Sequence, residues 1–151
     1  MNTVKILHCA DIHIGAALSY LGDTAAQRKY ETLLTFERII DTAVTVGVKI
    51  IAAAGDIFDS NTVEEGFVNA VFEKIEYVPD IKVVFSAGNH DPLSADSPFK
   101  TRELPKNLFV LGAKDECITF DDLKTRVYGR AFDDVYLRGE ESFSIIPEKD
   151  G

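Results

Sequence analysis

The architecture expected for this chain follows from one stretch, Val48-Lys49-Ile50-Ile51-Ala52-Ala53-Ala54-Gly55-Asp56-Ile57-Phe58-Asp59. It begins as a short apolar run typical of a buried β-strand, and the run stops at a glycine followed by a carboxylate. Similar runs occur at Val4 to Cys9 and at Ile81 to Ser86, and helical patterns separate them. This alternation predicts an α/β fold with right-handed crossovers and a parallel sheet that is covered on both faces.

Two amphipathic helices are predicted between these strands. The first spans Gln27 to Val46, and Gly47 stands where a left-handed C-cap is expected. The second is expected to open at Ser60-Asn61-Thr62, because Thr62 and Glu65 fit a capping box.

The second half of the chain has shorter units. Pro92 to Asn107 is rich in proline and serine and is expected to form an ordered loop with room for a helical turn. Four further strands without intervening helices are predicted at Leu108–Leu111, Cys117–Phe120, Arg126–Phe132 and Ser142–Ile146. They fit an antiparallel or mixed edge of the sheet, or a second sheet.

Composition limits the class of protein. A chain of 151 residues is one domain's worth of length, and 46% hydrophobic residues are enough for a core. Two cysteines, Cys9 and Cys117, are too few for a disulfide framework, which favours a cytoplasmic setting. No apolar run reaches membrane-spanning length, so no membrane partner is expected. The net charge of −9 argues against a surface that binds nucleic acid by itself. If the substrate is DNA, other parts of the protein must supply much of the affinity.

Polar side chains follow the first of the predicted strands. Asp11 and His13 are two residues apart on chain expected to be extended, so both should point to one side. A carboxylate beside an imidazole could supply half of the coordination shell of Mn, Fe or Zn. His8 lies inside the strand, and we interpret it as a structural histidine and not as a ligand.

The second strand ends at Gly55-Asp56-x-x-Asp59. Asp56 is the natural bridge between two cations, because a carboxylate has two oxygens and Gly55 permits a close backbone approach. Asp59 has two open interpretations, as a partner for a catalytic histidine or as a carboxylate at a helix N-terminus.

The third strand ends at Gly88-Asn89-His90-Asp91. Asn89 offers an amide oxygen, a common ligand for hard cations. His90 could act as a general acid near neutral pH if a carboxylate orients it, and Asp59 is the best candidate. Asp91 precedes a proline and reads as a turn-former. Because ligands bind beyond the carboxyl ends of parallel strands, the three motifs together indicate a metal site.

In this order, the three motifs resemble the first three motifs of the calcineurin-like metallophosphoesterases. The sequences Cys9-Ala10-Asp11-Ile12-His13-Ile14-Gly15 and Gly55-Asp56-Ile57-Phe58-Asp59 are most similar to the SbcD-type DNA-repair exonucleases. The resemblance implies two facing mixed sheets flanked by helices. It also implies a two-metal phosphodiesterase that uses Mn²⁺, with Fe²⁺ or Zn²⁺ as alternatives. DNA, an SMC-like ATPase subunit and a homodimer are the implied partners.

The resemblance also assigns roles to residues. Asp11 and His13 would hold the first metal, Asp56 would bridge, and Asn89 would hold the second metal and contact the phosphate. His90, oriented by Asp59, would protonate the leaving oxygen. The family adds further histidines on later strands, whereas the three histidines of this sequence all precede residue 91. Residues 1–151 are therefore expected to form the N-terminal portion of a longer nuclease domain, weak or inactive alone.

Two other functions stay open. The same metal core serves phosphoesterases that act on nucleotides, phosphoproteins or phospholipids, and the fold cannot choose between them. A truncated or degenerate domain that binds one metal or none would have no catalytic role.

Overall fold

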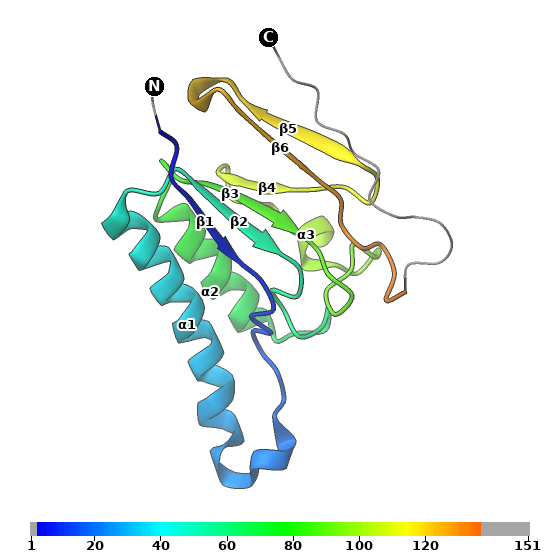
Figure 1. Ribbon diagram of the computed structural model, residues 1–151. Helices are drawn as coiled ribbons and strands as arrows, with labels where there is room; N and C mark the ends of the chain where they lie inside the picture. The colour runs from blue at the N-terminus through cyan, green and yellow to red at the C-terminus, as the bar shows by residue number, and fades with distance from the viewer. Residues whose placement is uncertain (1–2, 137–151) are drawn as a thin grey trace.

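A four-stranded parallel sheet forms the centre of the molecule in the computed structural model, which describes residues 3–136 (Figure 1). The strands lie in the order β1-β2-β3-β4, the order of the sequence. Their bounds are Ile6–Cys9 for β1, Ile50–Ala54 for β2, Lys82–Ser86 for β3 and Leu108–Val110 for β4. The predicted α/β class and the first three predicted strands are confirmed, and β4 joins the same sheet.

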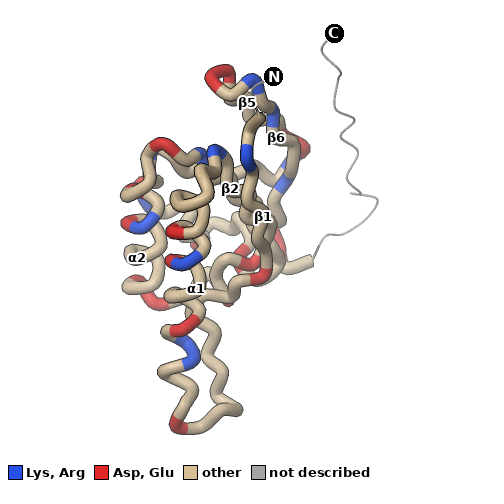
Figure 2. The backbone as a smooth tube through the Cα atoms, turned by 60° about the vertical axis from the view of Figure 1, so that its left-hand side comes forward, with Lys and Arg blue, Asp and Glu red and all other residues tan. Residues whose placement is uncertain are grey.

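The two long helices, α1 (Ala25–Val46) and α2 (Glu65–Glu76), lie side by side on one face of this sheet (Figures 1 and 2). Successive right-handed crossovers that move in one direction along a sheet place their helices on the same side. The other face meets an antiparallel hairpin of β5 (Glu116–Phe120) and β6 (Thr125–Gly129). The alternative of a second sheet is therefore confirmed, whereas the predicted strand at Ser142–Ile146 lies outside the described residues.

Three short helical segments complete the described chain. They are the 3-10 helices η1 (Ser19–Thr24) and η2 (Asp121–Leu123) and the helical turn α3 (Pro98–Thr101). The last confirms the turn expected between Pro92 and Asn107. In the described part of the chain no helix is long and apolar enough to cross a membrane.

The helix ends agree with the sequence at one position and differ at another. Gly47 adopts a left-handed conformation with φ 71° and donates its N–H to the last turn of α1, as predicted. The prediction of a capping box at Thr62 and Glu65 is wrong. Helix α2 begins only at Glu65, and its N-cap residue, Glu64, makes no side-chain hydrogen bond to the helix end. Asp59 therefore precedes the helix by more than one turn and is not a helix N-terminal carboxylate.

Each face of the sheet has its own apolar core. The larger core joins the sheet to α1 and α2, and the smaller core, which includes Val84, Leu111 and Phe120, joins it to the hairpin. Within the larger core, Phe99 of α3 packs against Phe58 and Phe85, with ring centroids 5.6 Å away in both cases. Phe58 belongs to the loop after β2 and Phe85 to the last part of β3, so Phe99 packs against the carboxyl ends of these two strands.

Replacement of Phe99 by alanine should lower the free energy of unfolding by about 3–5 kcal/mol, because a buried ring leaves a cavity that the neighbouring rings cannot fill. Urea denaturation of this chain measures the effect. Tyr77→Ala is the control, since that ring is 83% exposed and its loss should change stability by less than about 0.5 kcal/mol. Equal losses in the two variants would contradict the role given to Phe99.

Candidate metal centre

The loops after β1 and β2 continue the hydrogen bonding of the two strands beyond their ends. Four backbone hydrogen bonds join them, with donor first: Asp11–Gly55 (3.1 Å), His13–Asp56 (2.9 Å), Ile14–Ile57 (2.8 Å) and Asp59–Ile14 (3.1 Å). Ile14 and Phe58 also form a parallel bridge, and both are fully buried. The first two motifs are therefore held in register by the backbone and not only by their side chains.

Asp11, His13 and Asp56 all adopt left-handed backbone conformations, with φ of 52°, 51° and 53°. The expectation that Asp11 and His13 lie on extended chain is wrong, because β1 ends at Cys9. Left-handed conformations are uncommon outside glycine and are found most often at Asn, Asp and His. Each costs on the order of 1–3 kcal/mol and persists where the surrounding structure fixes it, as the backbone ladder does here.

These three side chains nevertheless converge. One ligand atom from each of Asp11, His13 and Asp56 lies within 4.8 Å of the other two. Asp56 is 8% exposed, and its carboxylate lies 3.9 Å from Nε2 of His13. Two carboxylates and an imidazole at this spacing fit Mn²⁺, Fe²⁺ or Zn²⁺ by their chemistry.

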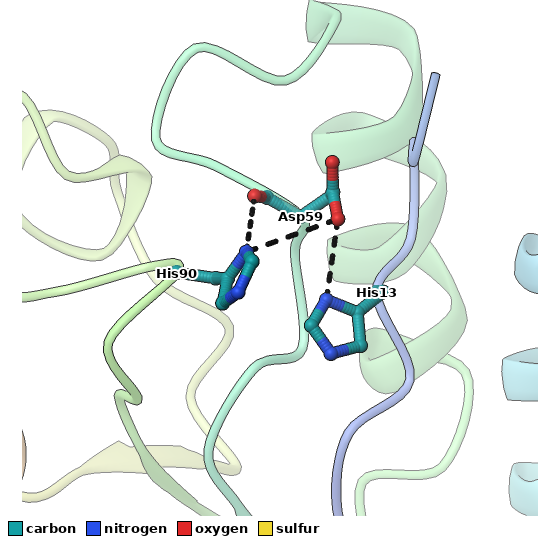
Figure 3. Close-up of side chains that lie close together, drawn as sticks. All are labelled: His13, Asp59 and His90. Carbon is teal, nitrogen blue, oxygen red and sulfur yellow. Dashed lines mark hydrogen bonds and ion pairs between the residues drawn. The ribbon is translucent and has the colours of Figure 1, made fainter. Parts of the chain in front are cut away.

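The other predicted site residues lie around this group. His90 and Asn89 are exposed at the end of β3, and the backbone N–H of His90 donates to Oδ1 of Asp56 at 3.0 Å. Asp59 stands between the two imidazoles (Figure 3). His8 is exposed within β1 and belongs to neither cluster of candidate ligands among the described residues.

Figure 3 shows how Asp59 contacts each histidine. Its carboxylate Oδ1 lies 3.2 Å from Nδ1 of His13, whereas the same oxygen lies 3.9 Å from Nδ1 of His90. The contact of His90 at hydrogen-bond distance is with the backbone carbonyl of Asp59, at 3.1 Å. The two imidazole rings meet edge to face, with centroids 4.7 Å apart.

Asp91 has a role that the sequence did not reveal. Its side chain is fully buried, and its carboxylate accepts N–H bonds from Ile57 (2.8 Å), Phe58 (3.0 Å) and Gly88 (2.7 Å). Asp91 therefore joins the loop after β2 to the loop after β3. The sequence signal for it was a carboxylate before a proline, which a turn explains equally well.

Burial sets the ionisation of Asp91. It raises the pKa of the carboxyl, and the three N–H donors lower it part of the way, while the nearby charge of Asp56 raises it. A raised folded-state pKa means that ionisation of Asp91 costs stability as pH rises through that value. The three hydrogen bonds limit this cost.

Gly88 brings the end of β3 close to Asp56. A Cβ atom added at Gly88 would overlap the Asp56 carboxylate and would stand 2.6 Å from the Asp56 backbone nitrogen. Any side chain at this position would therefore displace a candidate ligand. Conformational freedom is not the reason for glycine here; the reason is the close approach of two loops.

Comparison with known proteins agrees with this geometry. Residues 4–150 match the family model of the calcineurin-like phosphoesterases, and the chain belongs to that family. A similar protein is the DNA double-strand break repair protein Mre11 of Methanopyrus kandleri. It is 26% identical over 138 residues, which cover 83% of this chain and 30% of the relative.

Replacement of Asp91 by alanine should lower the free energy of unfolding by roughly 3–5 kcal/mol, because three buried N–H groups lose their acceptor. The free energy of unfolding of Asp91→Asn should lie between those of Asp91→Ala and the original chain, since the amide nitrogen of asparagine cannot accept a hydrogen bond. Urea denaturation provides the measurement. Asp80→Asn, at an exposed position, serves as the control for the loss of one charge. Stability of Asp91→Ala within about 0.5 kcal/mol of the control would contradict the role of the carboxylate.

Gly88→Ala should weaken Mn²⁺ binding by about tenfold or more, because the new methyl group displaces Asp56, and a shifted ligand loses coordination geometry. Calorimetric titration with Mn²⁺ measures the change. Gly66→Ala is the matched control, since a Cβ at that position in α2 meets no atom within 4 Å. Unchanged Mn²⁺ affinity in Gly88→Ala would mean that Asp56 does not hold the ion.

Proposed function

We propose that this protein is a metal-dependent phosphodiesterase with a two-metal centre, and that it acts as a DNA exonuclease subunit in DNA repair. The observation that carries the proposal is the convergence of Asp11, His13 and Asp56 beyond the ends of β1 and β2. Membership of the calcineurin-like phosphoesterases supports the reaction class. The repair role is supported by similarity to a relative named for double-strand break repair, of which this chain spans 30%.

The ligand set of the proposal assigns Asp11 and His13 to the first ion, Asp56 to both ions, and Asn89 to the second ion and the phosphate. When bound, divalent ions at this position would lower the pKa of water and neutralise charge that develops on the phosphate. Mn²⁺ is the proposed metal, with Fe²⁺ and Zn²⁺ as alternatives that accept the same donors.

His90 supplies the proton for the leaving oxygen in this proposal. A carbonyl oxygen can only accept a hydrogen bond, so the contact with the Asp59 backbone fixes the proton of His90 on Nδ1. Nε2 is then the atom that exchanges a proton with the substrate. The side chain is 45% exposed, which leaves this nitrogen accessible to a substrate.

If the substrate is DNA, much of the affinity for DNA must come from outside residues 3–136. With a net charge of −9, this chain repels a phosphate backbone except where bound cations offset its carboxylates. We propose that an SMC-like ATPase subunit and a second copy of the chain contribute to binding in the intact, cytoplasmic protein. Salt-dependent binding of DNA by the intact protein tests this part, and indifference to DNA would contradict it.

One observation favours a second candidate, a phosphodiesterase for small nucleotides. A cavity of about 690 Å³ adjoins His90, and its lining includes Asp96, Asp133, Asp134 and Tyr136. Carboxylates repel further phosphates but accept hydrogen bonds from sugar hydroxyls and base amino groups, and a tyrosine ring can stack on a base. Faster hydrolysis of a short nucleoside phosphodiester than of DNA would support this candidate.

His90→Gln should keep the Mn²⁺ content of the intact protein while the hydrolysis rate of a phosphodiester with a poor leaving group falls by about 10²–10⁴-fold. The two measurements are calorimetric titration with Mn²⁺ and turnover of the diester. The rate for bis-p-nitrophenyl phosphate should fall less, since its leaving group needs little protonation. Loss of an ion in His90→Gln would make His90 a ligand and would contradict the assignment.

A further inference from the structure

We propose that Asn61 is a positioning residue for His90, because its side chain joins the loop that follows His90 to the loop after β2. This inference rests on the proposed function, in which His90 gives a proton to the leaving oxygen. In the sequence Asn61 belongs only to the expected opening of a helix, whereas the structure places it in the loop before α2.

The amide of Asn61 makes two contacts with the loop after β3. Its Nδ2 donates to the backbone carbonyl of Pro92 at 2.8 Å and to the hydroxyl of Ser94 at 2.7 Å, which are 31 and 33 residues further along the chain. A carbonyl oxygen can only accept a hydrogen bond, so the nitrogen of the amide and not its oxygen must face Pro92. Asn61 is half-buried, and partial exclusion of water strengthens both hydrogen bonds.

A tight turn holds Asn61 in its place. The N–H of Val63 donates to the carbonyl of Ser60 at 3.2 Å and closes the turn in which Asn61 lies. Two residues earlier, Asp59 contacts Nδ1 of His90 with its backbone carbonyl at 3.1 Å and with its carboxylate at 3.9 Å. The stretch from Asp59 to Asn61 therefore contacts His90 at one end and the loop after His90 at the other.

His90 lies between two connections that join the loops after β2 and β3. On the buried side, Asp91 joins these loops through its three N–H bonds. On the open side, Asn61 joins them through Pro92, and both residues line the cavity beside His90. Since the side chain of His90 is 45% exposed, packing fixes its position only in part, and the backbone on either side must supply the rest.

The loop after His90 has support from its far side as well. The N–H of Leu93 donates to the carbonyl of Phe132 at 2.8 Å, and Nζ of Lys100 donates to the carbonyl of Leu93. These contacts join the loop to α3 and to the chain after β6. Asn61 joins it to the loop after β2, so loss of the amide should let the loop move away from Asp59 while the rest of the fold persists.

The candidate ligands are held by other contacts. Backbone hydrogen bonds join the loop of Asp11 and His13 to the loop of Asp56, and Asp91 accepts from the N–H of Gly88, next to Asn89. Substitution of Asn61 should therefore leave the number of bound Mn²⁺ ions and their affinity unchanged. Loss of Mn²⁺ binding in Asn61→Ala would overturn the inference, because Asn61 would then support the ligands and not His90.

The first test compares Asn61→Ala with Asn69→Ala in the intact protein. Two thymidine phosphodiesters that differ only in the leaving group, one an alcohol and the other p-nitrophenol, report on proton transfer. Since a displaced acid slows only the reaction that needs its proton, Asn61→Ala should lower the ratio of the alcohol rate to the p-nitrophenol rate by about tenfold at saturating Mn²⁺. Asn69 is an exposed asparagine on α2 that accepts from Arg102, and its loss should leave the ratio unchanged.

Ser94→Ala separates the two acceptors of Asn61. It removes the hydroxyl and leaves the carbonyl of Pro92, so the ratio should change less than in Asn61→Ala. An equal change in the two variants would overturn the role given to the contact with Pro92.

A second measurement needs neither metal nor turnover. Hydrogen exchange at the amide N–H groups of Leu93 and Ser94 in the intact, metal-free protein should be about tenfold faster in Asn61→Ala, because the loop loses one of its connections. Unchanged exchange, or faster exchange with an unchanged leaving-group ratio, would overturn the inference. Absence of hydrolysis by the unsubstituted intact protein would remove the proposed function, while the exchange rates would still decide whether Asn61 holds the loop.

Discussion

One buried carboxylate, that of Asp91, joins the loop that carries Asp56 to the turn that carries Asn89 and His90. Asp91 accepts three backbone N–H bonds, two from the loop that carries Asp56 and one from the turn that carries Asn89 and His90. Those N–H groups are far from water, so each needs an acceptor within the protein. A carboxylate satisfies all three at once, and a neutral side chain of similar size cannot. The distance between the second and third motifs therefore depends on this group more than on any contact between the ligands themselves.

Strain and order are balanced in the first two motifs. Asp11, His13 and Asp56 each occupy a left-handed conformation that short polar residues tolerate. The three side chains nevertheless meet beyond the sheet edge, with one ligand atom of each within 4.8 Å of the other two. The ladder of backbone hydrogen bonds beneath them offsets the cost, because both loops are already aligned by β1 and β2. Parallel strands that end at one edge thus supply both the place of the site and the rigidity that it needs.

The sequence predicted where the site lies better than how it is built. Apolar runs ending in Gly55-Asp56 and Gly88-Asn89 identify strand ends without knowledge of any contact, and Gly47 marks a helix end through its backbone alone. The partners of Asp91 are more than thirty residues away for two of its three hydrogen bonds, so no local pattern reveals them. The start of α2 was misplaced for a different, local reason. The hydroxyl groups of Ser60 and Thr62 form a hydrogen bond with each other in the loop, so Thr62 does not cap the helix.

Several carboxylates gather at the candidate site, and their charges bear on its stability. Asp56 and Asp91 are both buried, and burial first and the charge of Asp56 second raise the pKa of Asp91. Asp11 has an oxygen within 4.8 Å of one of Asp56, in a chain that is already acidic. Cations held by Asp56 would relieve this repulsion in the folded state alone, because the ligands disperse on unfolding. A ligand at one hundred times its dissociation constant adds about 2.7 kcal/mol to the stability of the state that binds it. If these carboxylates hold a metal ion, its occupancy would be coupled to the stability of the loops that carry them.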